Sequence, residues 1–105
     1  MLMALTSKQR AELRAEAHRL TASVHVGHHG ATPALVQSLD DALRTHELVK
    51  VQLNRTADEK PKTVANALAA QVGADVVQVI GRTATLYRHN PEIKRKEGDL
   101  PPWQR

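Results

Sequence analysis

The sequence predicts a two-layer α/β (α+β) fold with the element order α-β-α-β-α-β-β and one four-stranded mixed sheet. Three observations lead to this prediction. Segments with apolar residues at helical spacing are interleaved with short segments in which apolar and polar residues alternate. A two-residue turn, Gly81-Arg82, joins the last two strand-like segments as in a β-hairpin. The 105 residues are enough for one domain with a single core.

The first predicted helix covers residues 6–20 and the first strand covers about 23–26. Thr6 or Ser7 can cap the start of this helix. Its apolar residues recur at helical spacing, at Leu13, Ala17 and Leu20. In the strand, Val24 and Val26 alternate with polar neighbours, which is typical of a half-buried strand.

A second helix is predicted at 33–46 and a second strand at 48–54. Thr32 is a good N-cap, and Pro33 suits the first helical position because its φ is already helical. One helix face carries Leu35, Leu39, Ala42, Leu43 and His46. The strand places Val49, Val51 and Leu53 on one side and polar residues on the other, so we expect a partly open sheet face.

The third helix follows Pro61 and ends before Gly73, which sits where a C-cap glycine belongs. Strands at 75–80 and 83–88 then form the hairpin. Because helices join the first strand to the second and the second to the third, we expect these pairs to run parallel. Residues 1–88 therefore form the predicted domain, and 89–105, with the run Lys94-Arg95-Lys96, form a loosely ordered basic tail.

The composition narrows the function classes. The absence of cysteine excludes disulfides, cysteine-based zinc sites and a cysteine nucleophile. Fifteen Lys and Arg face eleven Asp and Glu, and the sequence pI near 9.9 is typical of nucleic-acid-binding domains. Trp103 and Tyr87 are the only aromatic residues, which argues against a base-stacking platform. No apolar run could span a bilayer and Met1–Leu5 is too short for a signal peptide, so we expect a cytoplasmic protein without membrane contact.

The central motif is Gly27-His28-His29-Gly30, between the first strand and the second helix. Glycines permit a sharp turn and close approach of another backbone. The helix start after Thr32 offers backbone N–H groups and the positive end of a dipole, which favour an anion such as an RNA phosphate. The alternative is that the two glycines only make a tight turn.

Other chemistry is weakly supported. The sequence has no P-loop, dinucleotide or nucleophile-elbow motif, so we expect no nucleotide site or catalytic serine of these kinds. His25, His28 and His29 could gather around a metal ion, but no nearby carboxylate completes the set, so we expect neither metal nor cofactor. A bound phosphate would favour the charged form of His28 and His29, so RNA affinity should rise as pH falls through about 6.5.

The first predicted helix carries basic residues. Arg10, Arg14 and His18 recur every four residues and share a face, while Lys8 lies on a different side. This face is either solvated or contacts phosphates beside the glycine loop. Lys8, Arg10 and Arg14 are therefore candidate RNA contacts.

The chain resembles the CRM (chloroplast RNA splicing and ribosome maturation) domain, in its stand-alone bacterial YhbY-type form. The resemblance covers about residues 6–88 and depends on the element order and the Gly27-x-x-Gly30 loop. It also depends on His46-Glu47-Leu48-Val49-Lys50-Val51 and on Val77-Gln78-Val79-Ile80-Gly81-Arg82 leading into Leu86-Tyr87-Arg88.

The resemblance implies a fold similar to the C-terminal domain of translation initiation factor three. It implies a non-enzymatic RNA-binding protein that associates with precursors of the large ribosomal subunit, and we expect a monomer. Gly27 and Gly30 would shape the loop, His28 and His29 would face the RNA, and Arg10 and Arg14 would extend the surface. Two histidines stand where such loops often carry Lys or Arg. The alternative function is a protein-interaction module that docks a ribosomal protein, with incidental RNA contact.

Overall fold

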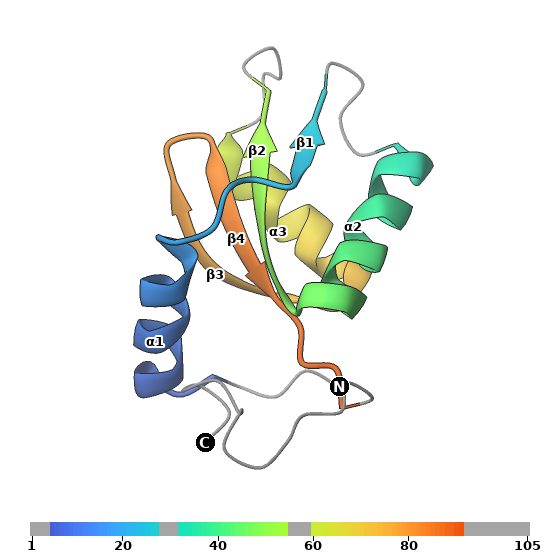
Figure 1. Cartoon of the computed structure of the whole chain (residues 1–105). Helices are drawn as coiled ribbons and strands as arrows, with labels where there is room; N and C mark the ends of the chain where they lie inside the picture. The colour runs from blue at the N-terminus through green and yellow to red at the C-terminus, as the bar shows by residue number, and fades with distance from the viewer. Residues whose placement is uncertain (1–4, 28–31, 55–59, 92–105) are drawn as a thin grey trace.

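The computed structural model describes residues 5–27, 32–54 and 60–91. Within these ranges the chain forms three helices and four strands, in the order that the sequence predicts. They are α1 (Ser7–Ala17), β1 (Val24–Val26), α2 (Pro33–His46), β2 (Leu48–Leu53), α3 (Pro61–Val72), β3 (Asp75–Ile80) and β4 (Thr83–Tyr87) (Figure 1). The predicted bounds of α2 and β3 are confirmed.

Helix α1 is shorter than predicted. It begins with a capping box in which Thr6 and Gln9 bond each other's backbone N–H groups. It ends at Ala17 because the next turn tightens: the N–H of Arg19 bonds the carbonyl of Glu16, and that of Leu20 bonds the carbonyl of Ala17. These bonds span three residues instead of four and satisfy carbonyls at the helix end.

The strands form one mixed sheet in the order β1-β2-β4-β3. Strands β1 and β2 are parallel neighbours, and β4 is antiparallel to both β2 and β3. Strands β2 and β3 therefore run in the same direction, as predicted, but β4 lies between them. The hairpin turn predicts that β4 pairs with β3 but not what lies at the other edge of β4. In the structure, β2 pairs with that edge.

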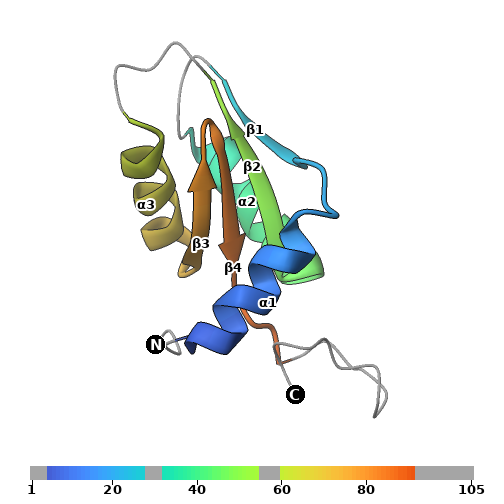
Figure 2. The same ribbon diagram turned by 90° about the vertical axis from the view of Figure 1, so that its left-hand side faces the viewer.

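Helices α2 and α3 cover one face of the sheet, and the main core lies between these layers (Figure 2). The strands contribute the alternating apolar residues Val49, Val51 and Leu53 that the sequence predicts for this face, and also Leu86. Helix α2 contributes Leu39 and Leu43, which are fully buried. His46 differs from the prediction: it is exposed at the end of α2, where the helix leaves the core.

Helix α1 packs on the opposite face but covers only part of it (Figure 2). Its fully buried Leu13 belongs to a second apolar cluster, together with Leu48, Val77 and Tyr87. The strand alternation places eight further residues on this side of the sheet: His25, Lys50, Gln52, Asp75, Gln78, Ile80, Thr83 and Thr85. The predicted partly open face is therefore the part that α1 leaves uncovered.

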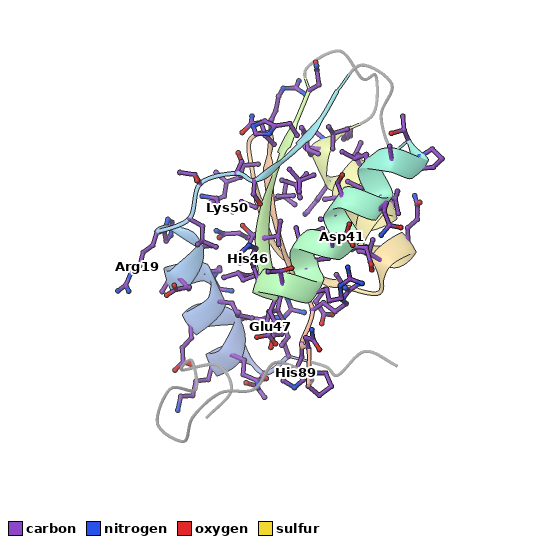
Figure 3. The ribbon with its side chains drawn as sticks, turned by 45° about the vertical axis from the view of Figure 1, so that its right-hand side comes forward. Arg19, Asp41, His46, Glu47, Lys50 and His89 are labelled. Atoms are coloured by element: carbon purple, nitrogen blue, oxygen red, sulfur yellow. The ribbon has the colours of Figure 1, made fainter. Side chains whose placement is uncertain are left out.

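The segment after β4 is fastened to α2. The guanidinium of Arg88 donates to the Asp40 carboxylate at 2.7 Å and to the Val72 carbonyl at 2.8 Å, linking β4 to α2 and α3. Glu47 follows α2, is 1% exposed and has a φ of 64°. Its carboxylate lies 3.1 Å from Nδ1 of His89 (Figure 3). The described structure thus continues past the predicted domain end at residue 88 as far as Pro91, and 92–105 lie outside it.

Candidate nucleic-acid interface

The ends of the two parallel strands meet at one end of the sheet. The N–H of Asn54 donates to the carbonyl of Val26 at 3.0 Å, so β2 and β1 end side by side. The N–H of Leu53 donates to the carbonyl of Arg82 at 2.7 Å, which brings the β3–β4 turn to the same place. Both α2 and α3 begin at this end (Figure 1). Ligands of sheets with parallel strands commonly bind outside the carboxyl ends of those strands. We call this region the loop end.

The start of α2 has the predicted cap. Thr32 has extended backbone, and its hydroxyl accepts a hydrogen bond from the N–H of Leu35 at 3.2 Å. The carbonyl of Thr32 accepts from the N–H of Val36, and Pro33 has no N–H. The N–H of Ala34 has no partner among the described residues and is the first-turn donor left for a ligand. The first turn carries no acidic side chain, so nothing there opposes an anion.

Gly27 is exposed at the end of β1. Its φ lies outside the positive range, so other residues can adopt its conformation. Apart from Gly27 itself and its two chain neighbours, no atom of the described structure lies within 4 Å of the place where a Cβ would stand. The open space at Gly27 suits an approaching ligand and not a close contact within the protein. His28, His29 and Gly30 lie outside the described residues.

Among the residues that the structure describes, three cationic side chains flank the loop end: Lys60, Lys62 and Arg82. Lys60 is the N-cap residue of α3, and Lys62 lies in its first turn. Both lysines are exposed. The Arg82 guanidinium donates to the carbonyl of Asn54 at 3.3 Å. These residues were not predicted as RNA contacts, although Lys60 and Lys62 follow β2 and Arg82 follows β3, and both strands run parallel to β1.

The basic residues of α1 are not brought to the loop end. Helix α1 lies on the opposite sheet face from α2, toward the other end of the sheet (Figures 1 and 2). Arg10 donates to the carbonyl of Val76 at 3.1 Å and so fastens α1 to β3. Lys8 and Arg14 are exposed and remain available to a ligand. An RNA that contacts both regions must therefore extend along the molecule.

The described residues offer little other chemistry. They contain no group of three His, Asp or Glu side chains placed to hold a metal ion. Tyr87 is 5% exposed, so it cannot serve as a stacking platform. None of the helices in the described ranges is both long and apolar enough to cross a membrane.

Comparison with known proteins supplies related chains. The model of the CRS1/YhbY (CRM) domain matches residues 5–88. The chain is 37% identical over 93 residues to the probable RNA-binding protein YqeI of Bacillus subtilis, covering 89% of this chain and 97% of that protein. It is 36% identical over 98 residues to the probable RNA-binding protein PA4753 of Pseudomonas aeruginosa, covering 93% of this chain and 94% of the relative.

A solved structure has the same fold. The solution structure of protein SAV1595 from Staphylococcus aureus superposes with a TM-score of 0.74 at 32% sequence identity. The match covers 87% of this chain and 95% of that one. The fold described above is therefore shared with an experimental structure.

Proposed function

Because this chain belongs to the CRS1/YhbY (CRM) domain family, we propose that it binds RNA through the loop end. The observation that carries the proposal is the open space at Gly27 beside the capped start of α2. A phosphate there would meet the N–H of Ala34 and the positive ends of α2 and α3. The names of the relatives as RNA-binding proteins support the same ligand.

The grip on RNA is electrostatic and directed at the backbone. Lys60, Lys62 and Arg82 surround the loop end, and His28 and His29 lie between the two glycines in sequence. Phosphate contacts position a protein without reading bases, and base stacking has no described aromatic platform here. Binding should therefore depend steeply on salt, because each neutralised phosphate releases counterions.

We further propose that the RNA is ribosomal RNA in precursors of the large subunit and that the protein assists assembly without catalysis. The family resemblance of the sequence supports this proposal. The test is sedimentation of the tagged protein with ribosomal particles from growing cells. Recovery with precursors of the large subunit is expected, and recovery spread equally over mature particles would contradict an assembly role.

The loop end is tested by a matched pair of variants at Gly27. Gly27→Asp places a carboxylate where the phosphate should approach, while Gly27→Ala adds only a methyl group that the open space accommodates. We expect Gly27→Asp to weaken binding of a structured RNA at least about tenfold, because it opposes a phosphate directly. Gly27→Ala should bind within about twofold of the unchanged protein, because its methyl group adds no charge.

Fluorescence anisotropy at several salt concentrations measures this difference, and circular dichroism checks that both variants fold. If the two variants bind RNA equally well, the phosphate does not approach Gly27 and the loop is only a turn.

A second candidate function has one observation in its favour. Ile80 is 59% exposed on the uncovered sheet face, where it could meet a ribosomal protein. This interaction module would be favoured if the protein binds a protein partner with an affinity that does not change with salt, and has no affinity for RNA.

A further inference from the structure

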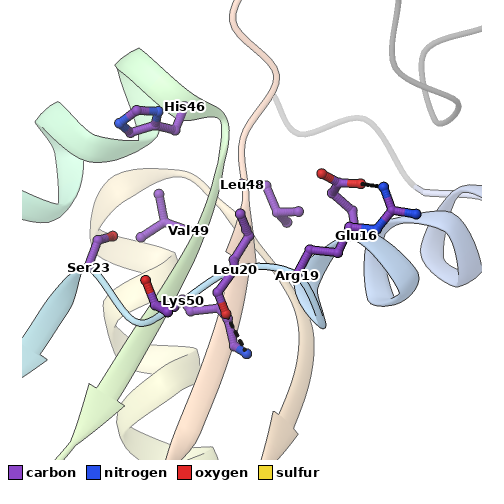
Figure 4. Close-up of a pocket in the computed structure, with 9 residues that line it drawn as sticks. Glu16, Arg19, Leu20, Ser23, His46, Leu48, Val49 and Lys50 are labelled. Carbon is purple, nitrogen blue, oxygen red and sulfur yellow. Dashed lines mark hydrogen bonds and ion pairs between the residues drawn. The ribbon is translucent and has the colours of Figure 1, made fainter.

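A pocket of about 360 Å³ lies between the end of α1, the segment that leads into β1, and the first residues of β2 (Figure 4). It is separate from the loop end, because it borders the start of β1 whereas Gly27 follows the end of that strand. Its volume falls within the range of about 300–1,000 Å³ typical of small-molecule sites. Nothing in the function proposed above uses it.

The pocket exists because β1 is shorter than β2. Val24 pairs with Val51, and the N–H of Ser23 donates to the carbonyl of Lys50 at 3.1 Å. Before Ser23 the chain turns away toward α1, so the edge of β2 at Leu48 borders the pocket. Strand alternation directs the backbone N–H and C=O of Leu48 to the same side as the carbonyl of Lys50. The pocket therefore combines a hydrogen-bonding strand edge with an apolar lining.

The lining has an apolar part and a charged part. Leu20, Leu48 and Val49 are the apolar lining residues. Leu48 and Val49 are 5% and 2% exposed, so the apolar side-chain surface that a ligand can meet is mainly that of Leu20. Arg19 and His46 stand at the border of the pocket (Figure 4). Glu16 is the one acidic lining residue, and its ion pair with Arg19 is long at 3.9 Å, with the Arg19 side chain 81% exposed. Such a pair is weak, so Arg19 can turn toward a ligand.

Lys50 also lines the pocket, and its Nζ is held by the carbonyl of Leu20 at 3.2 Å. It adds positive charge without having to reorganise. The two positive charges of Arg19 and Lys50 against the one carboxylate of Glu16 favour an anionic ligand, and the apolar surface of Leu20 favours a flat ring attached to it.

We infer that this pocket receives one unpaired nucleotide of the bound RNA. The base lies against Leu20 with its polar edge toward the Leu48 backbone, and the phosphate lies at Arg19 and His46. Strand β1, three residues long, spans on the order of 10 Å between the pocket and Gly27, so one RNA strand can reach both. The inference rests on the proposed RNA binding and adds the place where a base is held.

The test is a titration of the full-length protein with each nucleoside monophosphate, followed by ¹H–¹⁵N NMR. We expect shifts concentrated at residues 19–23 and 46–50, with weaker shifts for inorganic phosphate. Arg19→Ala should weaken nucleotide binding about fivefold, because a charged contact is lost. Arg44→Ala is the control: it removes the same charge from the exposed end of α2, where Arg44 pairs with Asp41 outside the pocket.

Ser23→Phe provides a test that leaves the net charge unchanged. Ser23 is exposed and lines the pocket, and its backbone bond to Lys50 survives the change. The phenyl ring should fill the site and abolish the nucleotide-induced shifts. Binding that survives Ser23→Phe, or that inorganic phosphate reproduces with equal affinity and equal shifts, would overturn the inference.

The same samples separate this inference from the proposed function. If structured RNA binds with a salt slope and Ser23→Phe leaves that affinity unchanged, the function stands and the nucleotide pocket is wrong. If the unchanged protein has no affinity for structured RNA, the proposed function fails, and so does a pocket for an RNA nucleotide.

Discussion

The carboxylate of Glu47 accepts a hydrogen bond from the backbone N–H of Asn90 at 2.8 Å. Forty-three positions separate these residues in sequence, and the bond fastens the segment after β4 to the end of α2. Glu47 is 1% exposed and has a φ of 64°, so the structure holds a charged side chain and a strained backbone at one point. This contact leads to the first prediction.

Replacing Glu47 should reveal both effects. Glu47→Ala removes the buried acceptor and keeps the strain, so we expect a loss of about 2–4 kcal/mol in the free energy of unfolding. Glu47→Gly also removes the acceptor but relieves the backbone, and it should be about 1 kcal/mol more stable than Glu47→Ala. Urea denaturation followed by circular dichroism measures both. A loss below about 0.5 kcal/mol for both variants would show that the carboxylate is not structural.

Arg88 should matter more for stability than Arg44, although both arginines pair with an aspartate of α2. Arg88 is 22% exposed and also bonds the carbonyls of Val72 and Asp40, which joins three elements. Arg88→Ala should cost about 1–3 kcal/mol, because these acceptors lose a charged donor. Arg44→Ala removes an exposed pair and should cost less than about 0.5 kcal/mol. Equal losses in thermal or urea unfolding would contradict this assignment.

The two basic regions should contribute differently to RNA binding. Lys60→Gln combined with Lys62→Gln removes two cations at the loop end, and Lys8→Gln combined with Arg14→Gln removes two from α1. RNA affinity falls as salt rises, so the slope of log K against log salt is negative. The Lys60 and Lys62 double variant should make this slope shallower by about one unit or more, because each lost phosphate contact reduces the number of counterions released. The second pair should change the slope less. Fluorescence anisotropy titrations at several salt concentrations measure both slopes. A larger change for the Lys8 and Arg14 variant than for the Lys60 and Lys62 variant would place the RNA site at α1.

Affinity for RNA should depend on pH through His28 and His29. A neighbouring phosphate stabilises the protonated imidazole, so the complex binds more protons than the free protein. Affinity should therefore rise as pH falls through about 6.5, the usual range of histidine. Changing both histidines to alanine should flatten this dependence, which titrations between pH 5.5 and 8 at fixed ionic strength would show. An unchanged slope in the double variant would assign the titration to other groups.

Local signals in the sequence predicted most of the elements. Thr32 and Pro33 define the start of α2, and Gly73 ends α3 with a φ of 67°, because caps and left-handed residues depend on near neighbours. Gly81, in the predicted turn between β3 and β4, has a positive φ of 57°. The element order and the mixed sheet follow from such signals and are confirmed.

Long-range pairing was not predictable in the same way. By alternation, Leu48 lies on the polar side of β2 with Lys50 and Gln52. It is nevertheless 5% exposed, because α1 packs on that side of the sheet and covers it. Arg10 looked like a free cation, but it reaches a carbonyl 66 positions away. The likeness to initiation factor three, the monomeric state and the cytoplasmic location stay predictions.

The central place of β4 has a consequence for how the chain acquires its structure during synthesis. Of the four strands that the structure describes, β4 is the last to be made, yet it pairs with β2 on one side and β3 on the other. Until Thr83–Tyr87 has been synthesised, β3 cannot join the parallel pair, and the apolar faces of α2 and α3 lack a complete sheet. Folding therefore depends on contacts distant in sequence and reaches completion only at the end of the domain. A nascent chain truncated at Gly81 should remain sensitive to protease, and one extended through Pro91 should become resistant.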